Sequence, residues 1–306
     1  MRVLVTGGAG FIGSHSVEAL LAAGDDVVVL DNLSSGRRAN LPRHARLRVV
    51  EGDVRDRAAV APALRDCTHV LHLAAQVSVQ ASIEDPPNSA QHNIVGFTNV
   101  LDCARRDRVE RVVFASSAAV YGNPQTLPLS EESPTGPLSP YGLEKLVNEQ
   151  HAALFTRLFE LSALGLRYFN VYGPGQDPAS QYAGVISRFA ERMLANAPLT
   201  VFGDGQQTRD FIFVKDIAQT NLAALRGEAT GFCNIGTGRT TSLLALIDLL
   251  AECVGHAAEI VFAPPAPGDV RHSAMTPARM REWLGNGTPT PLRDGLLALL
   301  ETLRPV

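Results

Sequence analysis

Three glycines near the start of this chain limit its possible folds more than any other feature. They are Gly7, Gly10 and Gly13. They come directly after an apolar, β-branched run, Arg2–Thr6, and they open a segment, Phe11–Ala23, that has the pattern of a helix. A helix N-terminus presents unpaired amide donors, and glycine lets a diphosphate approach them because no Cβ stands in the way. The spacing predicts a dinucleotide-binding turn at the start of a parallel α/β sheet.

The first half of the chain alternates short β-branched runs with helical patterns, which is typical of βαβ units. The expected strands are Arg2–Thr6, Asp26–Asp31, Leu47–Val50, His69–Leu73, Arg111–Ser116 and Ser162–Arg167. After about residue 168 proline and glycine break this rhythm, although helices are still expected at Gly184–Ala195, Asp216–Leu225, Leu243–Cys253 and Leu292–Leu303. We predict a Rossmann-like doubly wound α/β fold. Residues 1–168 form its dinucleotide-binding domain, and residues 169–306 form a smaller α/β substrate lobe that returns some segments to the first domain.

The composition argues against several classes of function. The chain has 306 residues, 45% of them apolar and 19% charged, and a formal net charge of −4. This composition is typical of a globular protein, and the slight acidity argues against a nucleic-acid partner. No apolar run approaches the roughly 20 residues that span a bilayer, and no signal peptide is expected, so we predict no membrane partner. The four cysteines are too widely spaced for a metal or redox pair, which predicts a cytoplasmic protein with reduced thiols and no metal.

Acidic residues after the second and third strands indicate which dinucleotide binds. Asp31 ends the second strand, eighteen residues beyond Gly13, where a carboxylate can accept hydrogen bonds from the adenosine ribose and repel a 2′-phosphate. This favours NAD, although Arg37 and Arg38 leave NADP as an alternative. Asp53, just after the third strand, either bonds the adenine amino group or stabilises a turn.

A tyrosine and a lysine provide candidate catalytic groups. Tyr141 and Lys145 lie four residues apart at the start of an expected helix, which places them on one face. A nearby ammonium favours the phenolate and lowers the pKa of the tyrosine toward a value useful for a general base. The strand Arg111–Ser116 delivers Ser117 to the ligand-binding edge of the sheet, whereas the pair alone could be a coincidence on a helix surface.

Seven segments spread over nearly the whole chain form one ordered set of motifs. They are Thr6–His15, Asp31–Gly36, His72–Gln76, Ser116–Gly122, Tyr141–Lys145, Arg167–Gly173 and Thr208–Ile212. The set resembles the extended short-chain dehydrogenase/reductase family and, within it, the nucleotide-sugar 4-epimerases.

This resemblance implies residue roles. Tyr141 would exchange a proton with the sugar 4-hydroxyl, Ser117 would bond O4, and Lys145 would hold the nicotinamide ribose, while a hydride passes from C4 to NAD and returns to the other face of a 4-keto sugar. The implied cofactor-binding residues are Gly7, Gly10, Phe11, Ile12, Gly13, Asp31, Asn32, Ser35, Gly36, Asp53, Val54, Leu73, Ala74, Ala75, Gln76, Asn93, Ser116, Tyr141, Lys145 and Tyr168. The implied substrate-binding residues are Ser78, Ser117, Tyr141, Asn170, Val185, Arg209, Asp269, Arg271 and Ser273. Arg209 would pair with the substrate diphosphate, its alternative being a surface ion pair with Asp210.

The residues after the fifth strand argue against a related reaction. Nucleotide-sugar 4,6-dehydratases resemble this chain but need an Asp-Glu pair where it has Ala118 and Ala119, which cannot donate protons. Two alternatives to a UDP-hexose 4-epimerase stay open: a UDP-glucuronate 4-epimerase, and a non-catalytic protein that senses NAD or serves as a scaffold. The presence of Tyr141, Lys145 and Ser117 argues against the second.

The second half of the chain bears on the choice of sugar. Ser273 follows the motif Pro267–Asp269, where relatives restricted to glucose and galactose resemble one another in carrying tyrosine. A small residue leaves room for an N-acetyl group, so we favour UDP-GlcNAc/UDP-GalNAc, with UDP-Glc/UDP-Gal as additional or alternative substrates. Ala266 and Gly175 replace arginines that are frequent in the family, and Arg271 is a candidate to compensate at the diphosphate.

The resemblance also implies a homodimer. Two long helices, Asn93–Arg106 and Pro140–Leu161, would form a four-helix bundle across the twofold axis. Leu146, Leu154, Leu158 and Leu161 are compatible with this, but packing inside one chain explains them equally.

Overall fold

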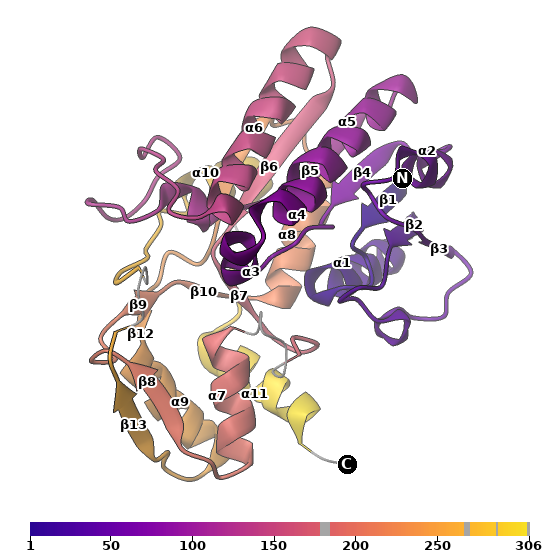
Figure 1. Cartoon of the computed structure of the whole chain (residues 1–306). Helices are drawn as coiled ribbons and strands as arrows, with labels where there is room; N and C mark the ends of the chain where they lie inside the picture. Colours follow the sequence, from indigo (N-terminus) through magenta and orange to yellow (C-terminus); the bar gives the residue numbers. More distant parts are fainter. Residues whose placement is uncertain (178–183, 266–269, 286, 305–306) are drawn as a thin grey trace.

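A seven-stranded sheet with only parallel neighbours forms the larger lobe of this computed structural model, which describes residues 1–177, 184–265, 270–285 and 287–304 (Figure 1). The strand order is β11-β6-β5-β4-β1-β2-β3. The strands are β1 (Arg2–Thr6), β2 (Asp26–Asp31), β3 (Leu47–Glu51), β4 (His69–His72), β5 (Arg111–Ser117), β6 (Ser162–Tyr168) and β11 (Gly231–Ile235). The six predicted strands are confirmed to within one residue at each end. The seventh, β11, was not predicted, and it pairs with β6 although it lies in the second half of the sequence.

Both faces of this sheet are covered because its strands carry apolar side chains on alternate sides. In β1, Val3 and Val5 belong to one buried cluster and Leu4 to the other. Helices α1 (Phe11–Ala22), α8 (Val214–Arg226) and α10 (Ala278–Leu284) contribute to the first cluster. Helices α2 (Arg57–Leu64), α5 (Gly96–Arg106) and α6 (Pro140–Phe159) contribute to the second.

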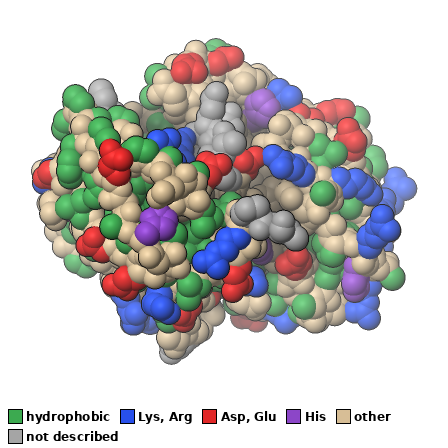
Figure 2. Space-filling model, turned by 90° about the horizontal axis from the view of Figure 1, so that it is seen from below, with side chains coloured by type: hydrophobic (Ala, Val, Ile, Leu, Met, Phe, Trp, Pro, Cys, Tyr) green, Lys and Arg blue, Asp and Glu red, His purple; other side chains and the backbone are tan. Residues whose placement is uncertain are grey.

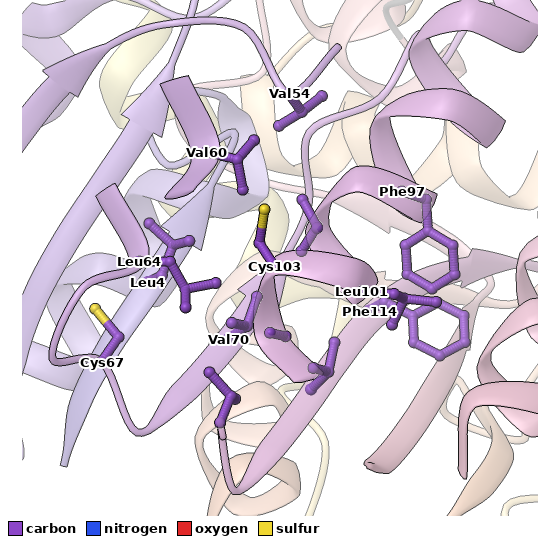
Figure 3. Close-up of a cluster of buried hydrophobic side chains, with 14 of the residues drawn as sticks. Leu4, Val54, Val60, Leu64, Cys67, Val70, Phe97, Leu101, Cys103 and Phe114 are labelled. Carbon is purple, nitrogen blue, oxygen red and sulfur yellow. The ribbon is translucent and has the colours of Figure 1, made fainter. Parts of the chain in front are cut away.

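The second cluster is drawn in Figure 3, where side chains of α5 lie over β4 and β5. Phe97 of α5 and Phe114 of β5 place their ring centroids 4.8 Å apart, and Leu101 lies beside them. Burying an aromatic side chain of this size contributes roughly 3 kcal/mol or more to stability. This packing fixes α5 and α6 over the end of the sheet that carries the candidate site.

Short elements connect the long ones. They are η1 (Arg38–Asn40), α3 (Val79–Glu84), α4 (Pro86–Ala90), the π-helix η2 (Gln91–Val95) and η3 (Ala118–Tyr121). The run from α4 through η2 into α5 is continuous. The expected helix Asn93–Arg106 therefore begins inside a π-helical segment rather than at its own cap.

The smaller lobe lies below the sheet in Figure 1. Its helices are α7 (Val185–Leu194), α9 (Leu243–Val254) and α11 (Leu292–Leu303). Its strands pair as β7 (Asn170–Tyr172) with β10 (Phe211–Phe213), β8 (Leu199–Phe202) with β13 (Ile260–Ala263), and β9 (Thr208–Arg209) with β12 (Thr241–Ser242). The four helices predicted in this half are found, and α8 packs against α1 of the larger lobe instead of joining the smaller one.

Charged side chains are unevenly distributed over the surface. Figure 2 shows acidic and basic groups together on one face, with Lys and Arg gathered toward the right-hand edge, the side on which β2 and β3 lie in Figure 1. The segment between these strands includes Arg37, Arg38, Arg43 and Arg46. The small net charge of the chain thus conceals a difference between the basic edge near β2 and β3 and the rest of this face, where both signs of charge occur together. Across the described ranges, no helix combines the length and apolar character needed to cross a membrane.

Candidate active site

Two of the predicted cofactor-binding segments lie where the strand order of the large sheet reverses. β1 lies between β4 and β2, and the sheet grows outward from it in both directions. Ligands of open α/β sheets bind at the carboxyl ends of the strands beside such a point. The glycine turn follows β1, and the predicted cofactor-lining segment Leu73–Gln76 follows β4, so both reach this edge.

The glycine turn is closely packed against its surroundings. Gly7 has a φ of +69°, and a Cβ there would lie 2.6 Å from the Ala74 amide nitrogen. A Cβ on Gly13 would lie 2.1 Å from the Gly7 carbonyl oxygen. Gly10 precedes α1 without a capping side chain, so no side chain covers the amides of the first turn, which begins with Phe11 and Ile12. These are the features that a diphosphate site at a helix N-terminus requires.

Asp31 lies beside this turn as predicted. Its buried carboxylate accepts hydrogen bonds of 2.9 Å from the amides of Ala9 and Leu33. Arg37, one of the two arginines that left NADP open, forms an ion pair of 2.6 Å with Asp177. Both side chains of this pair are exposed, so the preference for NAD over NADP rests on the buried Asp31 carboxylate and not on Arg37.

Asp53 has the contacts of a turn residue. One carboxylate oxygen accepts from the amide and Nε of Arg55, and the other accepts from Arg55 and from Asn32 Nδ2 at 2.7 and 2.8 Å. The Arg55 side-chain hydrogen bonds hold the pKa of Asp53 well below its usual range. These four bonds use the acceptor capacity of the carboxylate, so they favour the turn role over a bond to adenine. Of the other predicted positions nearby, Ser35 is exposed, Gly36 packs on Ala9, and Val54 belongs to the cluster of Figure 3.

The start of α6 brings Tyr141 close to Ser117. The hydroxyl of Ser139 accepts a hydrogen bond from the Gly142 amide and so fixes the helix start at the residue before Tyr141. A Cβ on Gly142 would lie 2.7 Å from the Ala119 carbonyl oxygen. Glycine is therefore needed for the helix to approach the backbone that follows Ser117.

Lys145 lies below the tyrosine, one helical turn further on. Its Nζ donates to the Ala115 carbonyl at 2.9 Å and lies 5.7 Å from the centroid of the Tyr141 ring. Burial lowers the pKa of Lys145 to about 8, although Glu144 opposes this. Burial also raises the pKa of Tyr141, a hydrogen bond with Ser117 offsets part of the rise, and Glu144 adds to it. The expected lowering of the Tyr141 pKa by Lys145 is thus not found in the protein alone, where burial has the largest effect on this pKa.

The cofactor-lining segment after β4 is held by one side chain. Asn93 Oδ1 accepts from the Gln76 amide at 2.8 Å, and Asn93 Nδ2 donates to the Gln76 carbonyl at 2.9 Å. Beneath this segment His72 is buried and lies 2.8 Å from Thr6 Oγ1. Burial, with a smaller effect of the Lys145 charge, lowers the pKa of His72 to about 3, so the ring is neutral.

Two predicted cofactor residues direct their side chains into the core. Ser116 Oγ donates to Glu149 at 2.6 Å, and Glu149 forms a buried ion pair of the same length with Arg167. The hydroxyl of Tyr168 donates to Asn221 of α8 at 2.6 Å. The hydroxyl groups of both residues are thus already engaged inside the protein.

Residues of the smaller lobe form a second group. The Thr208 amide donates to the Arg271 carbonyl at 3.0 Å, and the Ser273 amide donates to the Thr208 carbonyl at 3.1 Å, which brings Arg209, Arg271 and Ser273 together. Arg209 donates to the carbonyls of Thr208 and Arg271 at 2.9 and 3.3 Å. Arg271 itself pairs with Asp204 at 2.7 Å, and both side chains are exposed.

The remaining substrate positions differ in what the structure describes. Asn170 Nδ2 donates to the Asp210 carbonyl at 3.0 Å, while the buried Asp210 carboxylate accepts from Thr237 and Gly238. Ser78 caps α3, and Val185 is the first residue of α7. Asp269, Ala266 and the rest of the Pro267–Asp269 motif lie outside the described residues.

Sequence analysis missed two buried residues next to the catalytic pair. Glu144 is 3% exposed and Ser89 is 1% exposed, and the hydroxyl of Ser89 donates to Glu144 at 2.8 Å. The only sequence signal was the place of Glu144 inside the Tyr141–Lys145 segment. A glutamate beside a lysine on a helix is usually a solvated residue, so the pattern did not indicate burial.

Comparison with known proteins places this geometry in a family. The model of the NAD dependent epimerase/dehydratase family matches residues 3–236. The chain belongs to the NAD-dependent epimerase/dehydratase family. The family match ends one residue after β11, so it takes in the whole seven-stranded sheet, whereas Arg271 and Ser273 lie beyond it.

Individual members of the NAD-dependent epimerase/dehydratase family align over nearly the full chain. UDP-glucose 4-epimerase of Mycolicibacterium smegmatis is 41% identical, with 99% of each chain covered. The structure of UDP-N-acetylglucosamine 4-epimerase from Methanobrevibacter ruminantium M1, in complex with UDP-N-acetylmuramic acid, has a TM-score of 0.95 at 33% identity and covers 98% of this chain and 97% of that one. The Thermus thermophilus UDP-glucose 4-epimerase complex with NAD has a TM-score of 0.91 at 39% identity, with 99% of each chain covered.

Proposed function

We propose that this protein is a 4-epimerase of UDP-hexoses that works with tightly bound NAD. The observation that carries the proposal is the convergence of Tyr141, Lys145 and Ser117 at the carboxyl end of β5, beside the glycine turn. The named activities of the M. smegmatis and T. thermophilus relatives support the reaction and the substrate class.

NAD fits the residues at this edge. The turn leaves no space for a Cβ at Gly7 or Gly13, as a close approach of diphosphate to backbone requires. Asp31 supplies a carboxylate where the adenosine ribose of a dinucleotide would lie. The cofactor in the T. thermophilus structure supports the same assignment.

The mechanism assigns one task to each of the three side chains. When bound, NAD supplies a hydride acceptor at C4 of the sugar and a positive charge that favours a nearby phenolate. The Tyr141 oxygen takes the proton from the 4-hydroxyl. It gives the proton back to the 4-keto oxygen after the sugar has rotated to present its other face. Ser117 bonds O4, and the Lys145 ammonium stabilises the phenolate and holds the nicotinamide ribose.

The smaller lobe selects the nucleotide sugar. Arg209 and Arg271 supply guanidinium groups for the diphosphate. Ser273 is a small residue bonded to Thr208 of the same group, which supports acceptance of UDP-GlcNAc/UDP-GalNAc as well as UDP-Glc/UDP-Gal. The M. ruminantium relative, which bears the name of an N-acetylglucosamine enzyme, supports the larger sugar. In this assignment residues 1–168 bind the cofactor and residues 169–306 bind the substrate. The exceptions are β11 and α8, which lie in the second half of the sequence but pack in the larger, cofactor-binding lobe.

A panel of UDP-sugars tests the function. The protein is incubated with UDP-glucose, UDP-N-acetylglucosamine and UDP-glucuronate, and inversion at C4 is followed by proton NMR. Inversion of either of the first two is expected. Inversion of UDP-glucuronate alone would show that UDP-glucuronate, and not a UDP-hexose, is the substrate. If no sugar is inverted and no NAD is bound, a scaffold role would be favoured.

Replacement of Tyr141 by phenylalanine tests the mechanism. Tyr141→Phe removes the proton-transferring oxygen, so kcat is expected to fall by at least about a thousandfold while bound NAD stays at the wild-type level. Absorbance of the gel-filtered variant measures the NAD. Full turnover in this variant would exclude Tyr141 as the acid/base.

The long helices carry a surface suited to a homodimer. Four apolar side chains of α6 are between 38% and 58% exposed: Leu143, Leu154, Leu158 and Phe159. Helix α6 lies beside α5 at the upper edge of Figure 1. Two of the leucines that the sequence suggested for the dimer surface pack inside the chain instead. Leu161 belongs to the buried cluster of Figure 3, and Leu146 packs on a cluster around Phe169. A dimer through a four-helix bundle would cover the exposed apolar side chains. A monomer in gel filtration would exclude it.

The cysteines support a reducing location. All four are free, and Cys67, Cys103 and Cys233 are buried. Free thiols persist in the cytoplasm, where we place this enzyme.

A further inference from the structure

A buried carboxylate lies between the two catalytic residues of α6. Glu144 Oε2 accepts hydrogen bonds from Ser89 Oγ at 2.8 Å and from Asn93 Nδ2 at 2.6 Å, and all three residues are at least 97% buried. Within the described part of the chain, no Lys, Arg or His nitrogen comes within ion-pair distance of this carboxylate. Burying an unpaired carboxylate is costly, so its retention here suggests a task beyond packing.

The partner Asn93 connects this carboxylate to the cofactor-lining segment. The same side chain bonds both main-chain groups of Gln76, at 2.8 and 2.9 Å. Its amide orientation is fixed, because Nδ2 must face two acceptors, the Gln76 carbonyl and Glu144, while Oδ1 faces the Gln76 amide. Helices α3 and α4 and the π-helix η2, which supplies Asn93, lie against α6 at this point (Figure 1).

We propose that Glu144 is a positioning residue: through Asn93 it ties the helix that carries Tyr141 and Lys145 to the main chain that lines the cofactor at Gln76. A charge-assisted bond from Asn93 holds this tie more strongly than a neutral one would. The proposal rests on the proposed function for its meaning, and its first test needs no turnover.

The negative charge of Glu144 also acts on the catalytic pair. It raises the pKa of both Tyr141 and Lys145, so that Lys145 keeps its proton to higher pH than burial alone would allow. Other groups nearby are neutral, paired or bonded at the surface: the His72 pKa is near 3, and Glu149 is paired with Arg167. The groups on the surrounding elements include His72, Glu84, Asp85, His92, Tyr121, Glu149 and Arg167, and α5 adds Asp102, Arg105 and Arg106, which are paired with one another.

Two substitutions separate the tie from the charge. Glu144→Leu removes both, whereas Glu144→Gln keeps an oxygen that can accept from Ser89 and Asn93 and removes only the charge. Release of NAD from the holoenzyme into buffer is measured for each by fluorescence. Release is expected to be about tenfold faster in Glu144→Leu and within about threefold of wild type in Glu144→Gln. Equal release from Glu144→Leu and wild type would overturn the tie.

The pH profile of kcat tests the charge in Glu144→Gln. Activity requires protonated Lys145 and deprotonated Tyr141, whose phenolate the charge of bound NAD favours, so a bell-shaped wild-type profile is expected. Without the carboxylate both pKa values fall, and both limbs are expected to move to lower pH by about half a unit or more. Ser89→Ala, which keeps the charge, is the matched control and should leave both limbs in place. If both limbs of the pH profile stay in place in Glu144→Gln, the proposed effect of the Glu144 charge is wrong. A wild-type protein that inverts no sugar would reject the proposed function, but the NAD-release test of the tie would still apply.

Discussion

Two ion pairs, one in each lobe, hold their charged side chains in different ways. In the larger lobe, Glu149 and Arg167 form an ion pair with exposed side-chain fractions of 4% and 2%, and Glu144 is buried among hydrogen-bond donors. In the smaller lobe, the Arg271–Asp204 pair is 62% and 52% exposed. Buried polar groups have few alternative partners, whereas exposed ones can exchange theirs for water or a ligand. The buried groups of the larger lobe are therefore held in one arrangement, and we propose that the exposed Arg271–Asp204 pair can exchange its partner for the nucleotide sugar.

The strongest test of the rigid lobe is Gly13→Ala. The added Cβ would meet the Gly7 carbonyl oxygen at 2.1 Å, so the turn must move. We expect affinity for NAD to fall at least about a hundredfold, which is roughly 2.7 kcal/mol, in isothermal titration of the apoprotein. Gly287→Ala in the smaller lobe is the control, since its Cβ meets no atom within 4 Å. Unchanged NAD affinity in Gly13→Ala would show that the turn is not the diphosphate site.

The largest effect on stability is expected at the buried ion pair. Arg167→Met leaves the Glu149 carboxylate buried without its cation, which should lower the free energy of unfolding by about 3–5 kcal/mol in a urea titration. The double variant Glu149→Leu/Arg167→Met removes both charges and should recover part of the loss. A single variant within about 1 kcal/mol of wild type would mean that the larger lobe tolerates charge as the smaller one does.

The smallest effect on stability is expected in the adaptable lobe. Arg271→Ala breaks an exposed pair and should change the free energy of unfolding by less than about 1 kcal/mol. If the guanidinium binds the diphosphate as proposed, it does so before and after hydride transfer alike, and Arg271→Ala should raise KM for the UDP-sugar about tenfold with kcat nearly unchanged. Asp204→Asn keeps the guanidinium and should leave KM near the wild-type value. An unaltered KM in Arg271→Ala would remove this residue from the substrate site.

The same difference explains what the sequence could predict. Several of the strands β1 to β6 contain a continuous apolar or β-branched run, such as Val27–Leu30 in β2 and Val112–Ala115 in β5, and such runs indicate buried parallel strands without any knowledge of their neighbours. The strand β11 begins at glycine and contains the buried Asn234, so its five residues do not show that pattern. Tyr141, Lys145 and Ser117 could be proposed as candidates because their spacing is local and their chemistry is specific.

Residues whose role depends on partners distant in sequence could not be identified. Glu144 is separated from Ser89 by 55 positions and from Asn93 by 51, and only the packing of α4 and η2 on α6 brings the three together. The inward turn of Ser116 likewise depends on where Glu149 and Arg167 meet. Burial and long-range hydrogen bonding set these roles, and neither can be derived from the order of residues along one helix.

The π-helical segment has a consequence for the helix that contains it. A regular α-helix repeats every 3.6 residues, so the side chains that it presents on one side are determined along its whole length. Five π-helical residues, Gln91–Val95, wind more slowly and shift the phase of everything that follows. Asn93 can therefore point at the backbone of Gln76 while Phe97 and Leu101 point into the core. The π-helical turn thus lets one continuous helix project its side chains in two directions, toward the candidate site and toward the interior.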